Sequence, residues 1–445
     1  MTFDIDKQTT KDLELFPEKR NDKSIFSVYN RTATIGGRDL LLEVFSSPVS
    51  DLNFLQNRKE EINFFFNNDC SIKLNSGQLD YIEYYLRNQR VPLKDNIIDA
   101  TVDGVRNKLK PDSDYHTISE GILHIIRLLN KLDLFIEEAR AFPIPKILDN
   151  DLEKLKTFIS SKSLKKVLLQ SQVLSFSQIN YRDFVVRINS KNAFRDALDT
   201  VYKIDILQTL SQLMKKDGFT LPEYSSDPKT SFEVIDAIHP LLSLPIPNSF
   251  SFKQDTNLCF ITGPNMSGKS TFLKTIGLMV YHAHLGFPVP AKKLSISLFD
   301  GLFTTINLTD NLNLGYSHFY SEVKRVKDLV IKINTDRKLF IIFDELFRGT
   351  NVKDAYDASL MIISALAKIR DNLFFISTHI LEIAETIDNK DSIMFRCFES
   401  ELINLQPVYD FKLKEGISKE RIGLLIIKNE SIFEILDEIV RKQNK

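Results

Sequence analysis

The stretch that decides the fold is Leu258-Cys259-Phe260-Ile261-Thr262-Gly263-Pro264-Asn265-Met266-Ser267-Gly268-Lys269-Ser270-Thr271. It begins with an apolar run, continues into a glycine-containing turn and leads into residues that favour a helix from Phe272 to about Leu285. The turn has the spacing G-x-x-x-x-G-K-[ST], and a preceding strand and a following helix are the context that this spacing requires. An ordinary turn between a strand and a helix is the alternative. It does not explain why the strand, the loop, the Lys-Ser pair and the helix all stand in the required register.

These residue types suit a site that holds phosphate groups. Gly263 and Gly268 let the backbone turn so that successive N–H groups point inward, and the following helix adds its positive N-terminal end. Lys269 would reach the β- and γ-phosphates, and the Ser270 hydroxyl would ligate Mg²⁺. The sequence therefore predicts a nucleotide site whose residues are Gly263, Pro264, Asn265, Met266, Ser267, Gly268, Lys269, Ser270 and Thr271.

Length and composition limit the class of protein. At 445 residues the chain should hold two or more domains, because single cores stop growing at about 250 to 300 residues. The 58 Lys and Arg balance 59 Asp and Glu, so the net charge of −1 indicates no overall basic character and any nucleic-acid surface must be local. Cys70, Cys259 and Cys397 lack metal-site spacing, which favours reduced thiols.

The chain also lacks the patterns of export or membrane insertion. Residues 1–10 are polar and include Asp4 and Asp6, unlike a signal peptide, and no run of about 18 apolar residues occurs. We therefore predict a cytoplasmic protein with no membrane contact.

The N-terminal half has the periodicity of helices. Residues 1–23 are polar and predict a loose lead-in, whereas helical patterns begin at about Asp39 and Asp51 and cover 78–88, 117–141, 149–170 and 192–215. A core-facing stripe is formed by Ile118, Ile122, Ile125, Ile126, Leu129, Leu132 and Ile136. A solvated helix face best explains a basic scatter at Lys162, Lys165, Lys166, Arg182 and Arg187. Prolines between 222 and 248 mark a junction, so we predict an all-α domain over 24–225 and an α/β domain over 226–445.

Two carboxylates follow a second apolar run in the C-terminal half. Residues 339–343 are continuously apolar, as in a buried parallel strand, and Asp344-Glu345 comes next. Asp344 would hold Mg²⁺, while Glu345 would polarise the water that attacks the γ-phosphate. The same pattern can be an ordinary strand end, and the upstream phosphate loop favours the functional interpretation.

A histidine follows the third apolar strand. Residues 373–377 end at Thr378-His379. A histidine there is ordinarily a surface group, yet parallel sheets carry their chemistry beyond the carboxyl ends of their strands, which gives His379 a γ-phosphate contact. His282 and His284 lie two apart on the predicted helix and are interpreted as packing or surface residues.

Together these residues resemble the MutS family of DNA mismatch-repair ATPases. Thr262 to Thr271 is similar to its P-loop, and Val289-Pro290-Ala291 to the segment after its first helix. Further similarities are Ser317-His318-Phe319-Tyr320-Ser321-Glu322 to S-x-F-x-x-E, Asp344-Glu345 through Asn351 to D-E-x-x-R-G-T-[SN], and Ser377-Thr378-His379 to a T-H switch. Residues 30–40, with Pro48 and Arg58, resemble the start of its helical core, and 205–222 with His239-Pro240-Leu241 its end.

The resemblance implies fold, cofactors and partners. It implies an ABC-type P-loop ATPase domain with a mostly parallel sheet, preceded by an all-α core or lever domain and closed by a helix-turn-helix around residues 422–439. It implies ATP with Mg²⁺, DNA that is mismatched, branched or duplex, and a homodimer with composite sites. In such a site Ser317, at a helix start, would meet the γ-phosphate bound by the opposite subunit.

Departures from the family pattern narrow the expected function. Mismatch-recognising members carry a Phe-x-Glu wedge on an N-terminal domain, whereas only residues 1–23 precede the core here. Phe16-Pro17-Glu18 and Phe135-Ile136-Glu137 fit the wedge pattern, and we interpret both as chance because a wedge needs a folded domain behind it. No β-rich insertion is evident between 111 and 195, so the DNA clamp should be absent or vestigial. Phe347 and Ser267 stand where many members have Gly.

Three functions remain open. The favoured one is a MutS-like ATPase that acts on DNA without autonomous mismatch recognition. A transport-type ATPase subunit would share the sheet, but it should show an L-S-G-G-Q-like signature, which we do not find. A non-catalytic scaffold that binds ATP only to dimerise is disfavoured by Lys269, Ser270, Asp344, Glu345 and His379.

Overall fold

The chain folds into two compact units that alternate along the sequence. The computed structural model describes residues 2–19, 22–88, 90–94, 96–109, 113–168, 174–225, 229–306, 318–333, 337–347, 349–387, 390–403, 406–418 and 432–443. The helical unit comprises Tyr29–Ser46 and Gln56–Lys216, and the sheet unit comprises Met1–Val28, Ser47–Leu55 and Asp217–Lys445. Along the sequence, short segments of the sheet unit therefore flank parts of the helical unit.

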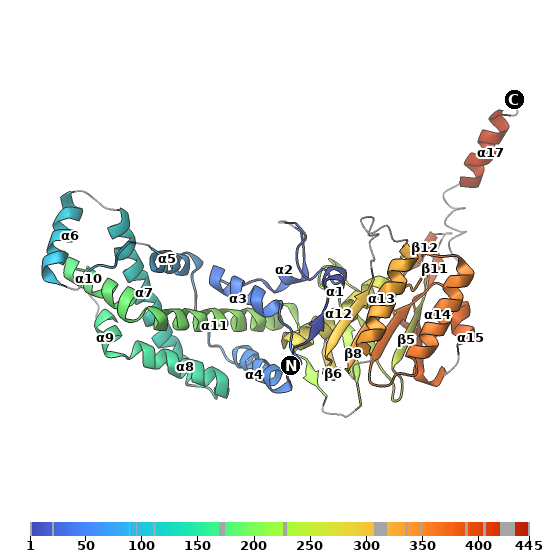
Figure 1. Cartoon of the computed structure of the whole chain (residues 1–445), viewed down its shortest axis with the longest axis horizontal. Helices are drawn as coiled ribbons and strands as arrows, with labels where there is room; N and C mark the ends of the chain where they lie inside the picture. The colour runs from blue at the N-terminus through green and yellow to red at the C-terminus, as the bar shows by residue number, and fades with distance from the viewer. Residues whose placement is uncertain are drawn as a thin grey trace. The chain divides into compact units, whose positions relative to one another are not determined.

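The helical unit is built from helices that Figure 1 shows in blue to green. They are α3 (Ile35–Phe45), α4 (Leu52–Asn67), α5 (Ser76–Leu86), α6 (Ile97–Leu109), α7 (Ser113–Ala139), α8 (Lys146–Ile159), α9 (Lys162–Leu168), α10 (Phe176–Phe184), the π-helical turn η1 (Val185–Asn189) and α11 (Lys191–Asp217). Its described residues between 113 and 189 form no strand, in agreement with the predicted all-α character.

The stripe predicted on α7 is the core of this unit. All seven of its side chains are buried, and Phe135 on the same helix is 2% exposed and stacks on Phe65 with ring centroids 6.4 Å apart. Phe135 is therefore unavailable as a wedge. Phe16, from the other wedge-like triplet, lies with its ring 6.3 Å from that of Phe26.

A buried carboxylate joins the two ends of the helical unit. Asp205 on α11 accepts hydrogen bonds from Ala33 N (3.0 Å), Thr34 N (3.0 Å) and Thr34 Oγ1 (2.8 Å). Thr34 in turn caps α3, because its Oγ1 accepts the N–H of Gly37 at 2.9 Å. A β-carbon added at Gly37 would lie 2.5 Å from the Asp205 carboxylate, so glycine is needed there. Burial raises the pKa of Asp205, while these hydrogen bonds oppose the rise.

The lysines and arginines that were predicted to lie on a solvated helix face fall into two groups, exposed and buried. Lys162, Lys165 and Lys166 are exposed on α9, as predicted. Arg182 and Arg187 are 2% and 7% exposed, so the prediction of a solvated face is wrong for them. Arg187 is held by the carboxylate of Asp183, with Nη2 to Oδ2 at 2.7 Å, because a buried charge needs a partner.

The sheet unit contains a seven-stranded sheet in the order β1-β7-β8-β9-β5-β10-β13. Every neighbouring pair is parallel except β10 and β13. Its strands are β1 (Asp4–Ile5), β5 (Leu258–Thr262), β7 (Gly301–Thr305), β8 (Leu339–Asp344), β9 (Leu373–Ser377), β10 (Ile393–Cys397) and β13 (Lys414–Glu415). Parallel strands bring their carboxyl ends to one edge, where the predicted site residues follow β5, β8 and β9.

Helices and a second sheet cover the two faces of this sheet. One face carries α13 (His318–Ile333), α14 (Val352–Leu366) and α15 (Glu382–Thr386), shown in orange in Figure 1. The other face packs against α12 (Lys269–Leu285) and a four-stranded sheet, with Phe340 and Phe375 in contact with Phe232. That sheet has the order β2-β6-β3-β4, from β2 (Glu223–Tyr224), β3 (Phe232–Ala237), β4 (Asn248–Ser251) and β6 (Lys293–Ile296).

The rest of the chain adds short elements. They are α2 (Ile25–Tyr29), the 3-10 turn η3 (Lys390–Ser392), the hairpin β11 (Ser400–Ile403) and β12 (Gln406–Tyr409), and α17 (Ile432–Gln443). Among the described helices, none combines the length and apolar character needed to cross a bilayer. The predicted fold class, a helical region followed by an α/β region with a mostly parallel sheet, is confirmed.

The first residues of the chain are part of the sheet unit. β1 pairs with β7, and α1 (Lys7–Asp12) follows it against the same strand. Asp12 is 1% exposed and its Oδ2 accepts hydrogen bonds from Thr304 Oγ1 (2.7 Å) and Ile306 N (2.9 Å). Leu13 packs on α12, where a β-carbon at Gly277 would lie 2.8 Å from it. This N-terminal segment, residues 2–16, differs from the loose lead-in that its polar sequence predicts, because its acidic groups are paired within the unit.

Candidate functional site

The loop between β5 and α12 has a backbone that wraps around a central space. Gly263 has φ 148°, Met266 has φ 67° and Gly268, the residue before α12, has φ 102°. A β-carbon at Gly263 would lie 2.7 Å from the carbonyl oxygen of Phe398, so glycine is required there. Met266 is 79% exposed in a left-handed conformation, which is uncommon for a residue with a side chain.

Lys269 lies inside this loop. Its side chain is buried and its Nζ donates hydrogen bonds to the carbonyl oxygens of Gly263 (2.8 Å) and Pro264 (3.0 Å). The ammonium group is thereby held within the turn, where an anion would meet both the charge and the helix N-terminus.

Asp344 connects the loop to the neighbouring strands. Its Oδ2 accepts a hydrogen bond from Ser270 Oγ at 2.5 Å, and its Oδ1 accepts one from Ser377 Oγ. Ser270 is the second residue of α12, Asp344 the last of β8 and Ser377 the last of β9. The two residues predicted to hold Mg²⁺ are thus in direct contact. Hydroxyl and carboxylate oxygens are hard ligands that suit Mg²⁺ together with phosphate oxygens, so these residues fit the ion.

Glu345 and His379 lie beside each other. His379 Nδ1 is 3.4 Å from Glu345 Oε2, and the Glu345 side chain is 15% exposed against 60% for that of His379. Glu345 has φ 59°, and its N–H donates to the carbonyl oxygen of Ser377 at 3.1 Å. An unusual backbone conformation fixed by a neighbouring strand is a feature that clusters at functional sites.

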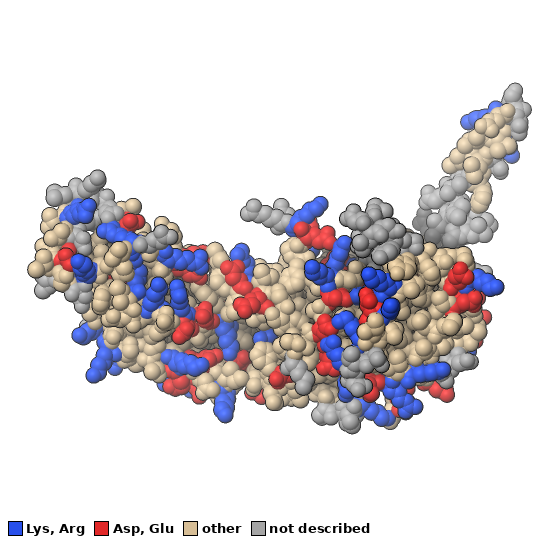
Figure 2. Space-filling model, viewed as in Figure 1, with Lys and Arg blue, Asp and Glu red and all other residues tan. Residues whose placement is uncertain are grey.

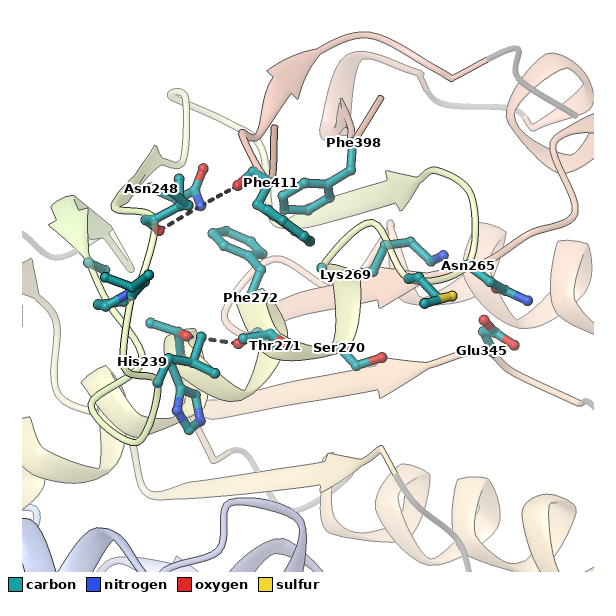
Figure 3. Close-up of a pocket in the computed structure, with 18 residues that line it drawn as sticks. His239, Asn248, Asn265, Lys269, Ser270, Thr271, Phe272, Glu345, Phe398 and Phe411 are labelled. Carbon is teal, nitrogen blue, oxygen red and sulfur yellow. Dashed lines mark hydrogen bonds between the residues drawn. The ribbon is translucent and has the colours of Figure 1, made fainter. Parts of the chain in front are cut away.

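A cavity of about 610 Å³ runs along the loop and is lined by eighteen residues that Figure 3 draws as sticks. Lys269, Asn265 and Glu345 lie at one end, and the rings of Phe411, Phe398 and Phe272 lie toward the other. Volumes of about 300 to 1,000 Å³ with mostly apolar walls and a few polar groups are typical of small-ligand sites. A charged end and an aromatic end suit a ligand that has an anionic part and a flat ring.

The structure brings most of the predicted site residues together. Among the residues predicted to bind nucleotide, Asn265, Met266, Gly268, Lys269, Ser270 and Thr271 line the cavity. Ser267 is 1% exposed, and its hydroxyl has no hydrogen-bond partner among the described residues. Ser317 lies outside the described residues. Of its motif, Phe319 packs on Phe347 with ring centroids 5.8 Å apart, and Glu322 is buried on α13.

Sequence reasoning missed the aromatic end of the cavity. Phe411 lies more than 140 residues after the phosphate loop, and no motif surrounds it. His239 was noted only as part of a family resemblance, yet it lines the cavity, and burial lowers its pKa to about 4. His282 and His284 are fully buried, so of the two roles considered for them, packing or surface, the structure shows packing.

Comparison with known proteins connects this geometry to a family. The family model described as MutS domain V matches residues 259–444, which include the loop, the Asp344-Glu345 pair and Phe411. This part of the chain belongs to the MutS family. The C-terminal half of the chain carries MutS domain V, an ABC-type ATPase domain, and the predicted family is confirmed.

Curated relatives of the MutS family match about half of the chain. The DNA mismatch repair protein MutS of Bacillus subtilis is 30% identical over 231 residues, or 50% of this chain and 26% of that protein. The protein of the same name from Anaplasma phagocytophilum is 29% identical over 51% of this chain and 28% of its own length. The DNA mismatch repair protein msh3 of Aspergillus oryzae is 26% identical over 59% of this chain and 24% of its own length. The matched part is less than a third of each relative.

Proposed function

We propose that this chain binds ATP with Mg²⁺ in the cavity and hydrolyses it. The proposal rests on one observation. Lys269, the Ser270–Asp344 pair and Glu345 lie together at one end of a single cavity. Lys269 would neutralise the β- and γ-phosphates, and the Ser270 and Asp344 oxygens would hold Mg²⁺. The ion supplies charge neutralisation between phosphates when it is bound.

Glu345 and His379 have separate tasks in this proposal. Glu345 accepts a proton from the attacking water, since it lines the cavity with a side chain that is 15% exposed. His379 contacts the γ-phosphate and, 3.4 Å from Glu345, restrains that carboxylate. Wild-type protein that binds ATP and never hydrolyses it would instead support the alternative function, a non-catalytic scaffold that binds ATP only to dimerise.

The aromatic end of the cavity would hold the base of the nucleotide. Phe411 is 41% exposed, and a β-carbon at Gly268 would lie 3.2 Å from its Cδ1, so the ring borders the phosphate loop. Stacking of a base on an exposed aromatic ring contributes about 1 to 3 kcal/mol.

We further propose that the chain acts as a homodimer in which Ser317 meets the nucleotide of the partner subunit. The support is α17, which exposes an apolar series on a terminal helix: Phe433, Ile435, Leu436, Ile439 and Val440. Exposed apolar series of this kind are typical of association surfaces. The predicted first half of the helix-turn-helix, with Ile422, Leu425 and Ile426, lies outside the described residues.

A chain that ends after Ser418 should lose ATP-dependent dimerisation. It keeps Phe411 and β13 but removes the apolar series of α17. Sedimentation velocity with ATP should give a dimer for the full chain and a monomer of about 48 kDa for the truncated one, scaled from 51.3 kDa by residue number. Leu436→Asp should also weaken the dimer, whereas Lys442→Ala is the control. A truncated chain that dimerises fully with ATP would contradict this role.

DNA is the proposed partner, and binding should carry little mismatch information. The matched relatives are named as DNA mismatch repair proteins. Figure 2 shows Lys and Arg mixed with Asp and Glu on the visible face of the helical unit, which suits salt-sensitive phosphate contacts more than sequence readout. Neither wedge-like phenylalanine is placed to press between bases, because Phe135 is buried against Phe65 and Phe16 lies against Phe26.

Affinities for homoduplex and single-mismatch DNA should therefore agree within about a factor of three, below the usual cost of one wrong base pair. We would titrate homoduplex, mismatch and four-way-junction DNA at two salt concentrations and measure ATP hydrolysis with each. Lys165→Ala with Lys166→Ala should weaken binding to all three equally. A tenfold preference for the mismatch by these 445 residues would overturn the prediction.

A further inference from the structure

Two segments that are distant in sequence meet beside the cavity through one side chain. Asn248, the first residue of β4, donates from Nδ2 to the carbonyl oxygen of Phe411 at 2.9 Å and to that of Ile246 at 3.3 Å. Its Oδ1 accepts the N–H of Leu413 at 2.8 Å. Figure 3 shows the dashed bonds from Asn248 beside the Phe411 ring. The asparagine thus binds the main chain on both sides of Lys412.

The residue held in this way has an unusual conformation. Phe411 has φ 53°, in the left-handed region that residues with a β-carbon rarely adopt. Such a conformation persists only where its surroundings impose it. Asn248 fixes both the Phe411 carbonyl and the Leu413 N–H. Asp410 Oδ1 accepts the N–H of Lys412 at 3.0 Å within the same segment, so Asn248 adds the constraint that comes from outside that segment.

The constraint matters because Phe411 is only partly enclosed by its surroundings. The residue is 41% exposed, its ring borders Gly268, and its ring centroid lies 6.0 Å from that of Tyr409. A second tie between the same segments, from Lys412 Nζ to the carbonyl oxygen of Pro247 at 2.7 Å, is exposed and does not reach the Phe411 backbone. Asn248 itself lines the cavity without being part of the phosphate loop.

We propose that Asn248 is a positioning residue that fixes Phe411 in its left-handed conformation, so that the ring is preorganised to stack on the base of a bound nucleoside triphosphate. This inference rests on the proposed function. Without Asn248 the segment relaxes to ordinary backbone angles and the ring leaves the cavity, while the phosphate loop keeps its geometry. Loss of Asn248 should therefore weaken the contact to the base and leave the contacts to the phosphates unchanged.

The test measures the binding of two probes by calorimetry, ATP and inorganic tripolyphosphate, each with Mg²⁺. Asn248→Ala should lower ATP affinity about tenfold, as expected for a lost stacking contact, and change tripolyphosphate affinity by less than about twofold. Phe411→Ala should show the same pattern. The double variant should lose no more than Phe411→Ala alone, because one residue acts through the other.

Ser249→Ala is the matched control, since Ser249 follows Asn248 on β4 and bonds to Asp236 N at 2.9 Å instead. Its ATP affinity should be unchanged. Asn248→Asp, which keeps the acceptor for Leu413 N, serves if Asn248→Ala does not fold, and should lower ATP affinity in the same selective way. Equal loss for both probes, additive effects in the double variant, or unchanged ATP affinity would overturn the positioning role. Wild-type protein that binds neither probe would overturn the proposed function itself.

Discussion

Replacement of Lys269 by alanine should lower ATP affinity by about a hundredfold or more. The ammonium group is buried in the phosphate loop, so its loss leaves the phosphates without their nearest positive charge. Removing one partner of a buried charged contact costs about 2 to 5 kcal/mol, and each 1.4 kcal/mol is a factor of about ten in affinity. Calorimetric titration with ATP and Mg²⁺ measures the change directly.

Two further variants make this result interpretable. Lys269→Met keeps the apolar stem and should lose the same affinity, which separates the charge from packing. Lys229→Ala removes a lysine of the sheet unit that is 61% exposed and pairs with Asp255, and should bind ATP normally. Folded Lys269→Ala protein with wild-type affinity would mean that the loop holds no phosphates.

Replacement of Glu345 by alanine should leave ATP binding within about threefold of wild type and lower the hydrolysis rate by about a hundredfold or more. A positioned general base contributes a factor of about 10² to 10⁴, and a carboxylate 15% exposed at the polar end of the cavity is placed for that task. Single-turnover hydrolysis of bound ATP separates this step from product release.

The left-handed backbone at Glu345 calls for a second variant. Glu345→Gln keeps the shape of the side chain and removes its basicity, so it should be as slow as the alanine variant. Glu385→Ala, an exposed carboxylate on α15, should hydrolyse ATP at the normal rate. Normal turnover in Glu345→Gln would remove Glu345 from the catalytic role.

The polar end of the cavity was predictable because short, continuous stretches of sequence contain the residues that form it. The phosphate loop is one unbroken stretch, and Asp344, Glu345 and His379 each lie at the end of an apolar strand or within two residues of it. Parallel strand order then brings these residues to one edge without any further knowledge of the fold. The helices were predictable for a similar reason, since the stripe on α7 repeats with the helical period.

The aromatic end depends on contacts that no window of sequence contains. Asn248 and Phe411 are 163 residues apart and neither belongs to a recognisable pattern. The N-terminal segment was misjudged for the same reason. Asp4 and Asp6 indicate a solvated tail when they are considered alone, yet Asp4 is 2.8 Å from Lys332 Nζ and Asp6 pairs with Arg325. These cations lower the pKa of both carboxyls against the opposing effect of burial.

The pairing of β1 with β7 also sets an order of events during synthesis. Thr9 bonds to Thr304 across 295 residues, and the whole helical unit lies between them in the chain. At about 5 to 20 residues per second, translation delivers β7 roughly 15 to 60 s after β1. We expect the helical unit, complete at Lys216, to collapse while β1 still has no neighbour. An unpaired strand edge is a template for wrong pairing, so β1 is exposed to misassembly until β7 has been made.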